Sequence, residues 1–129
     1  MILLDTHAWI WWVDDPSKLS QRAKATIDDT AMERGFYISS ISAWEVAMLV
    51  RKNRLQLTMD VDDWVAHTEA LPFVIFVPIS NRLAIKSVTL PIHPDPADRM
   101  IIATLLSLGA TIVTKDSKIS SYAQVQTVW

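Results

Sequence analysis

The chain has 129 residues and half of them are hydrophobic, which is enough for one domain with a substantial core and too little for two. We therefore expect a single domain spanning residues 1–129. The absence of cysteine excludes disulfide bonds, thiolate metal ligands and a cysteine nucleophile, so oxygen or histidine must hold any metal ion. No apolar stretch approaches the roughly 18 residues that cross a bilayer, and the N-terminus lacks a basic region followed by a long hydrophobic segment. We expect a cytoplasmic protein.

Strand-like and helix-like patterns alternate along the chain, as they do in βαβ units. Strands are predicted at residues 2–5, 36–39, 73–77, 111–114 and 125–128. Helices are predicted at residues 7–13, 20–31, 42–52, 60–70, 80–88 and 96–108, with a short helix after residue 116. This alternation predicts an α/β fold in which a mostly parallel sheet is covered by helices on both faces.

Local signals support several of these boundaries. Pro16 interrupts the first helical region, Ser20 is placed to cap the second helix, and Gly109 follows the helix at 96–108 as a helix-ending glycine. Three prolines lie between residues 91 and 96, so that segment cannot be helical throughout. We expect a rigid loop there, containing His93, that leads into the next helix.

Four acidic residues lie where a predicted strand ends or a predicted helix begins; they are Asp5, Glu45, Asp98 and Asp116. The carboxyl ends of parallel strands and the helix N-termini that follow them meet at one edge of a sheet. Asp5 directly follows the hydrophobic run 2–4, where an unpaired carboxylate is costly. Four carboxylates at one edge repel one another unless a divalent ion neutralises them. The pattern therefore predicts a site for a hard cation such as Mg²⁺ or Mn²⁺.

Three of these acids, taken singly, also fit a purely structural role. Ser42 and Glu45 have the spacing of a capping box. Asp95 could cap the helix whose first turn contains Asp98, and Asp116 could cap the short helix after it. The joint pattern favours the metal site.

The negative net charge of −2 argues weakly against nucleic acid as a partner, because dedicated nucleic-acid-binding proteins are usually basic. Without the four clustered carboxylates, however, the rest of the chain has a small net positive charge. Bound cations would make the cluster itself attractive to phosphate. The charge balance therefore does not exclude RNA.

Four segments resemble the PIN-domain ribonucleases, and specifically the VapC-like toxins of bacterial toxin–antitoxin pairs. They are Leu3–Ala8 (LLDTHA), Ser39–Glu45 (SSISAWE), Leu90–Arg99 (LPIHPDPADR) and Thr114–Asp116 (TKD). The resemblance implies a three-layer α/β/α sandwich and an acidic quartet on Asp5, Glu45, Asp98 and Asp116, with Asp98 rather than Asp95 in third place. It also implies RNA as substrate, and an antitoxin protein and a second copy of the chain as partners.

The reaction implied is metal-dependent hydrolysis of RNA, in which two ions roughly 4 Å apart activate water and stabilise the leaving oxygen. Asp5 would be the central ligand, Glu45 and Asp98 the flanking ligands, and Asp116 a ligand directly or through water. Three hydroxyl residues would orient these carboxylates or waters; they are Thr6, Ser42 and Thr114. Three basic residues near the acids are candidates for phosphate contacts; they are Arg99, Lys115 and Lys118.

Two other functions stay open at this level. One is a non-catalytic RNA-binding or regulatory PIN module. The other is aspartyl phosphotransfer, although a phosphatase of that kind needs a second aspartate where His7 stands. We interpret His7 as a packing or outer residue rather than a ligand. Trp9, Trp11 and Trp12 crowd one short helix, so we expect most of them in the core and the remainder, with Trp44, in an interface.

Overall fold

A parallel sheet forms the centre of this computed structural model, which describes residues 1–90 and 95–129. The loop and His93 predicted within residues 91–94 lie outside this described part. The strands found in it are β1 (Ile2–Leu4), β2 (Phe36–Ser39), β3 (Val74–Val77), β4 (Thr111–Val113) and β5 (Thr127–Val128). Their order in the sheet is β3-β2-β1-β4-β5, and each neighbouring pair is parallel. The predicted mostly parallel sheet is confirmed.

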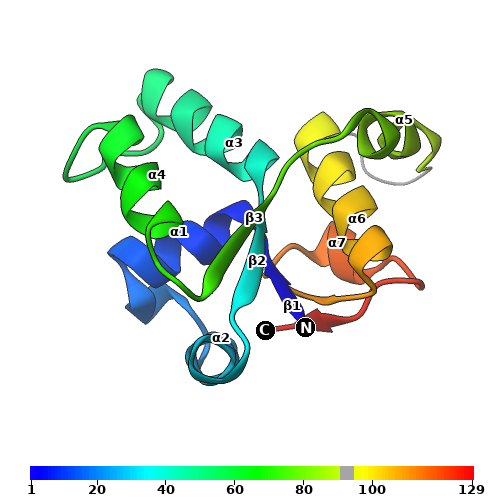
Figure 1. The fold of residues 1–129 in the computed structure, drawn as a ribbon, viewed down its shortest axis with the longest axis horizontal. Coiled ribbons are helices and arrows are strands. Elements are labelled where there is room, and N and C mark those ends of the chain that lie inside the picture. Colours follow the sequence, from blue (N-terminus) through cyan, green and yellow to red (C-terminus); the bar gives the residue numbers. More distant parts are fainter. Residues whose placement is uncertain (91–94) are drawn as a thin grey trace.

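Helices cover both faces of this sheet. The helices are α1 (Thr6–Asp14), α2 (Gln21–Glu33), α3 (Ser40–Arg51), α4 (Val61–Glu69), α5 (Asn81–Thr89), α6 (Pro96–Leu108) and α7 (Ser117–Ser120), with a short 3-10 helix, η1 (Pro16–Lys18), after α1. Figure 1 shows the sheet nearly edge-on, with α1 to α4 on one side and α5 to α7 on the other. The predicted α/β/α sandwich is therefore confirmed.

The alternation of side chains along β1 divides the core into two parts. Ile2 and Leu4 pack with the helices on the α1 side, whereas Leu3 packs with those on the α6 side. All three side chains are buried, as expected for a strand covered on both faces. The strand that carries Asp5 at its end is thus the most enclosed part of the sheet, and it holds that residue in a fixed position.

The helices around the sheet begin and end at residues suited to those positions. The hydroxyl of Ser20 accepts a hydrogen bond from the Ala23 N–H at 2.9 Å, and Gly109 ends α6 in the left-handed conformation, as predicted. The capping box predicted as one role for Ser42 is wrong, because α3 begins two residues earlier and Ser39 is its N-cap. Ser42 is therefore available for a contact outside its own helix.

The tryptophans of the core are held by their indole N–H groups as well as by packing. Trp9 donates to the Thr68 hydroxyl at 3.1 Å, Trp64 donates to Asp14 at 3.0 Å, and Trp12 donates to an oxygen of a half-buried aspartate in α2. The rings of Trp9 and Trp64 lie 4.7 Å apart. These pairs fasten α1 to α4 and α2. In the part of the chain described by the structure, no helix is long and apolar enough to cross a membrane.

Candidate active site

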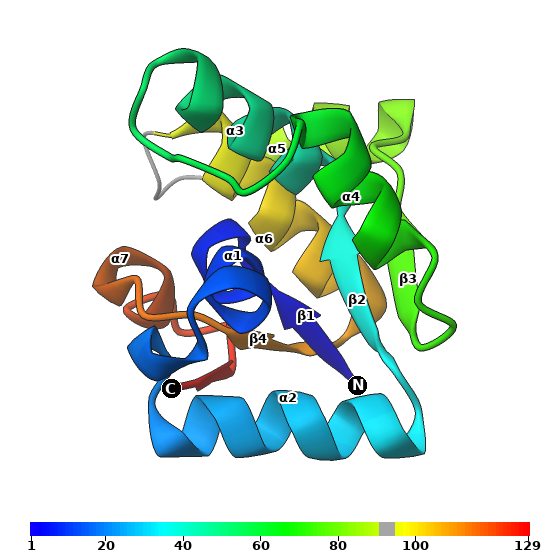
Figure 2. The same ribbon diagram turned by 90° about the vertical axis from the view of Figure 1, so that its left-hand side faces the viewer.

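The four predicted acids line one pocket of about 450 Å³ at the edge of the sheet where the strands end. Asp5 follows β1, Glu45 lies in the second turn of α3, Asp98 lies in the first turn of α6, and Asp116 is the N-cap of α7. Figure 2 shows the strands running from the side of the molecule near α2 toward α1, α3 and α7. Parallel topology thus brings together residues more than a hundred positions apart in the sequence.

Asp5 is the most enclosed of the four, with 7% of its surface exposed. Its Oδ1 accepts a hydrogen bond from the Ala8 N–H at 2.8 Å, and its Oδ2 accepts one from the Thr114 hydroxyl. Burial raises the pKa of Asp5, although these two hydrogen bonds act in the opposite direction; the nearby Glu45 carboxylate raises it further. The site therefore keeps a carboxylate in a place that disfavours its charge.

Glu45 is oriented by a chain of two hydroxyl groups. The Thr6 hydroxyl lies 2.6 Å from Oε1 of Glu45 and 2.9 Å from the hydroxyl of Ser42. A carboxylate only accepts and a hydroxyl has one proton to donate, so Thr6 donates to Glu45 and accepts from Ser42. Thr6 and Ser42 are both buried, which holds this arrangement in place. Two of the three predicted hydroxyl residues thus meet at the flanking acid.

The third hydroxyl residue, Thr114, joins the two other segments of the site. It donates to Asp5 and accepts a hydrogen bond from the backbone N–H of Asp116 at 3.0 Å. Asp116 in turn caps α7, because its Oδ1 accepts from the Lys118 N–H at 2.8 Å. Asp116 therefore both lines the pocket and caps α7.

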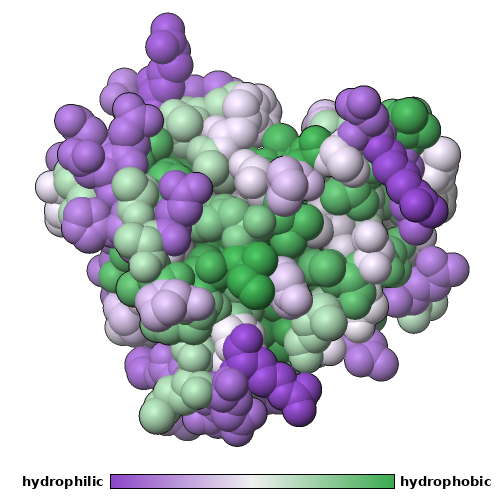
Figure 3. Space-filling view, viewed as in Figure 1, coloured by the Kyte–Doolittle hydropathy of each residue, from purple (hydrophilic) through white to green (hydrophobic). Residues whose placement is uncertain are grey.

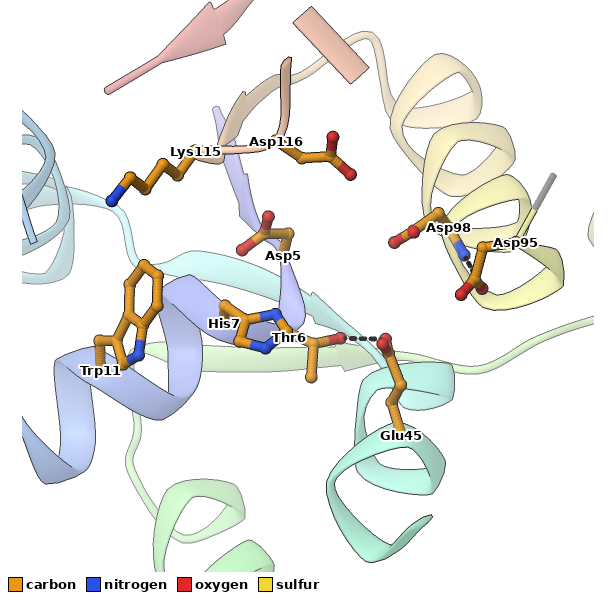
Figure 4. A pocket seen from close by; sticks show the side chains of 9 residues that line it. All are labelled: Asp5, Thr6, His7, Trp11, Glu45, Asp95, Asp98, Lys115 and Asp116. Carbon is orange, nitrogen blue, oxygen red and sulfur yellow. Dashed lines mark hydrogen bonds between the residues drawn. The ribbon is translucent and has the colours of Figure 1, made fainter. Parts of the chain in front are cut away.

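Asp95 lines the same pocket, but its carboxylate is engaged at the start of α6. Its Oδ1 accepts hydrogen bonds from the N–H groups of Ala97 at 2.8 Å and Asp98 at 3.3 Å. The structural role predicted for Asp95 is therefore confirmed. Asp98 points into the space between Asp5, Asp116 and Glu45, as Figure 4 shows.

The donor set fits a hard divalent cation better than any other common ligand, because it consists of carboxylate and hydroxyl oxygens. Within residues 1–90 and 95–129, no three acidic or histidine side chains are close enough as they stand to hold one ion. Two of the carboxylates are instead turned toward threonine hydroxyls. Binding of one ion by several of these acids would therefore require their carboxylates to move closer together.

Comparisons with known proteins identify the family and the fold. A model of the PIN domain matches residues 2–125. The chain belongs to the PIN-domain family. This PIN domain is 34% identical to Ribonuclease VapC22 of Mycobacterium tuberculosis over 132 residues, which cover 99% of this chain and 98% of that protein. The resemblance stated from four short segments is thereby confirmed.

Solved structures show the same fold at lower sequence identity. VapBC2 from Rickettsia felis, bound to a DNA fragment from its promoter, gives a TM-score of 0.68 at 17% identity, covering 99% of this PIN domain and 98% of that chain. FitAcB from Neisseria gonorrhoeae gives a TM-score of 0.64 at 23% identity, covering 100% and 97%. At these identities the likeness supports the fold alone.

The remaining wall of the pocket was only partly anticipated from the sequence of this PIN domain. Of the three predicted phosphate-binding residues, Lys115 lines the pocket, whereas Arg99 and Lys118 do not. His7 and Trp11 also line it; His7 was predicted as a packing or outer residue and Trp11 as part of the core or of an interface. Their spacing of four positions on a helix that starts directly after Asp5 was the available signal, because it places both on one face.

Proposed function

We propose that this PIN domain is a Mg²⁺- or Mn²⁺-dependent endoribonuclease and the toxin of a type II toxin–antitoxin pair. The observation that carries the proposal is the meeting of Asp5, Glu45, Asp98 and Asp116 in one pocket, each delivered by a different part of the fold. The identity of 34% to a ribonuclease over nearly the full length supports the same reaction. We also propose that residues 1–129 act as one domain in the cytoplasm.

The chain supplies the positioning that hydrolysis of a phosphodiester requires. A divalent ion at these carboxylates lowers the pKa of water and offsets the charge of the phosphate. Asp5 would be the central ligand, because it is the most enclosed of the four acids that line the pocket. Thr6 and Thr114 hold the carboxylates of Glu45 and Asp5 in fixed directions.

Lys115 is the candidate for a contact with the phosphate of the substrate. Lys115 lies next to Asp116 and extends along the pocket wall, away from Asp98 (Figure 4). Its ammonium group provides a point charge for a phosphate of the RNA backbone. Arg99 and Lys118 are more distant candidates for the flanking phosphates.

Two protein partners belong to the proposal. An antitoxin and a second copy of the chain are expected partners, and the molecule has apolar surface for them. Ile85 and Val88 on α5 are 70% and 74% exposed, and Ile75 on β3 is 47% exposed. Figure 3 shows hydrophobic residues in the middle of the face over β3, with polar residues around them. Exposed apolar patches of this kind commonly mark protein interfaces.

The proposal is tested by incubating purified protein with mixed RNA in Mg²⁺, in Mn²⁺ and in chelator. We expect cleavage only with the metals and none from the Asp5→Asn variant, whose amide is a poor ligand for a hard cation. A matched control is Asp60→Asn, since Asp60 is exposed and lies outside the pocket. Equal cleavage by wild type and Asp5→Asn would point to a contaminating nuclease and refute the assignment.

A further inference from the structure

The pocket has two chemically different ends. Asp98 and Glu45 lie at one end and Trp11 and Lys115 at the other, with His7 between them beside Thr6, as Figure 4 shows. The acidic end accounts for metal binding and the ammonium for a phosphate contact. Metal binding and the phosphate contact leave the rings of Trp11 and His7 in the pocket wall without a role.

Trp11 differs from the other tryptophans of its helix. The indole N–H groups of Trp9 and Trp12 donate to side chains of the core, at 3.1 and 3.2 Å. Among the contacts found for residues 1–90 and 95–129, the Trp11 indole N–H has no such partner, and its ring forms part of the pocket wall. Trp11 is half-buried and thus presents part of its ring to the pocket.

The ring of Trp11 is also braced in position. Its centroid lies 5.7 Å from that of Trp129 in a T-shaped contact on one side and 5.6 Å from that of His7 in a tilted contact on the other. Edge contacts of this kind favour a fixed ring orientation. His7 is itself exposed, and together the two rings form an aromatic part of the pocket wall.

We propose that Trp11, assisted by His7, stacks against the base of a nucleotide next to the bond that is cleaved. The inference rests on the proposed function and names its substrate class, which is RNA with an unpaired base at the site. Aromatic side chains bind single strands because every base has a π face, and a base paired within a helix cannot present that face. Lys115 on the same side binds the phosphate of that nucleotide.

Binding rather than cleavage tests this proposal, so that its outcome does not depend on nuclease activity. The background is Asp5→Asn, which prevents degradation of the RNA. Fluorescence anisotropy compares three labelled ligands, namely a ten-nucleotide oligouridine strand, an abasic strand of the same length and charge, and an RNA duplex. Trp11→Leu keeps apolar bulk against Trp129 but removes the π face, and Trp11→Phe keeps a ring.

We expect Trp11→Leu to weaken binding of the oligouridine strand about tenfold, as for loss of one stacked base, and to change binding of the abasic strand and the duplex less than twofold. Trp11→Phe should retain most of the affinity. Trp44→Leu is the matched control, because Trp44 is 51% exposed on α3 and lies outside this pocket. Trp44→Leu should change the affinity for the oligouridine strand and for the abasic strand by the same factor.

Equal weakening of the two single strands by Trp11→Leu, or no weakening of either, overturns the proposal. If Trp11→Leu does not fold, as judged by circular dichroism, His7→Leu takes its place, since His7 is exposed and its replacement leaves the core intact. A protein that fails to cleave RNA but shows the base-dependent loss keeps the stacking site and refutes only the nuclease. A protein that cleaves RNA without that loss refutes only the stacking site.

Discussion

Replacing Asp5 by asparagine should stabilise the metal-free protein while abolishing the site. The carboxylate is 7% exposed, and the effective cost of burying such an ion in a protein is several kcal/mol. Asparagine keeps an oxygen for the Ala8 N–H and caps a helix about as well as aspartate. It loses the hydrogen bond that the Thr114 hydroxyl donates to the charged Asp5 oxygen, which contributes about 1.5 to 3 kcal/mol. The balance favours Asp5→Asn by about 1 to 2 kcal/mol in chelator at neutral pH.

Metal should reverse this order. An ion present at 100 times its dissociation constant stabilises the folded state by about 2.7 kcal/mol. For a chain of this length, 1 kcal/mol corresponds to a change in Tm of roughly 4 °C. Wild type should therefore melt about 5 °C below Asp5→Asn in chelator and gain about 10 °C in saturating Mn²⁺, whereas the variant gains little.

The stability difference between wild type and Asp5→Asn should also depend on pH, which gives a second test of the argument from burial. Because burial raises the pKa of Asp5 above its ordinary value of 3.8, the cost of its charge is fully present above the raised pKa and is relieved as the pH falls toward 3.8. The advantage of Asp5→Asn in chelator should thus be largest at neutral pH and shrink on acidification. Carboxylates far from Asp5 are common to both proteins, so their contribution cancels in the difference.

Differential scanning fluorimetry of both proteins, in chelator and in Mn²⁺ at several pH values, provides the measurement. Asp60→Asn serves as the control, because Asp60 is exposed and its change should leave both the Tm and the Mn²⁺ response unaltered. A wild type that melts above Asp5→Asn in chelator would refute the argument from burial. An equal gain of both proteins in Mn²⁺ would refute the assignment of Asp5 as a ligand.

Two further predictions concern the contacts that shape the site and the sheet. Thr6→Val removes the hydroxyl that donates to Glu45 at 2.6 Å, so it should lower the Mn²⁺ affinity measured by calorimetry about 10- to 100-fold. Thr6→Ser keeps the hydroxyl and should keep the affinity. Unchanged affinity in Thr6→Val would contradict the orienting role of Thr6. Gly35→Ala should cost about 3 kcal/mol or more in urea unfolding, because its φ is +80° and the new Cβ would lie 2.3 Å from the Phe73 carbonyl oxygen. Gly109 has φ +63°, and a Cβ added there would have no atom within 4 Å, so Gly109→Ala should lower the free energy of unfolding by only about 1 to 2 kcal/mol. Equal losses of stability in the two variants would show that movement of the chain relieves the contact with Phe73.

The order of elements and the edge that carries the acids could be predicted because both depend on local patterns. Hydrophobic runs of three to five residues, separated by helical patterns, leave few arrangements other than a parallel sheet. In such a sheet Asp5 and Thr114 must lie side by side, since β1 and β4 are neighbours with Leu4 opposite Val113. The position of the site therefore followed from topology, whereas the roles of its residues remain predictions.

Contacts between helices could not be predicted in the same way. The spacing of Ser42 and Glu45 satisfied a local capping rule, yet the helix begins at Ser40, and Ser42 bonds to Thr6 on another helix instead. A rule that considers only residues close in sequence cannot detect a hydrogen-bond partner 36 positions away. The ring contact of Trp11 could not be predicted for the same reason, since its partner Trp129 is at the other end of the chain.

Thr6 and Thr114 orient acidic side chains of the site but cannot neutralise their charge. Thr6 begins α1 and Thr114 directly follows β4, and they hold the carboxylates of Glu45 and Asp5, which are 39 and 109 positions away. A hydroxyl fixes the direction of a carboxylate but adds no positive charge, so the pKa of Asp5 stays raised by burial. A bound cation removes that cost, and the folded state therefore gains most from metal at the residue on which the proposed reaction depends.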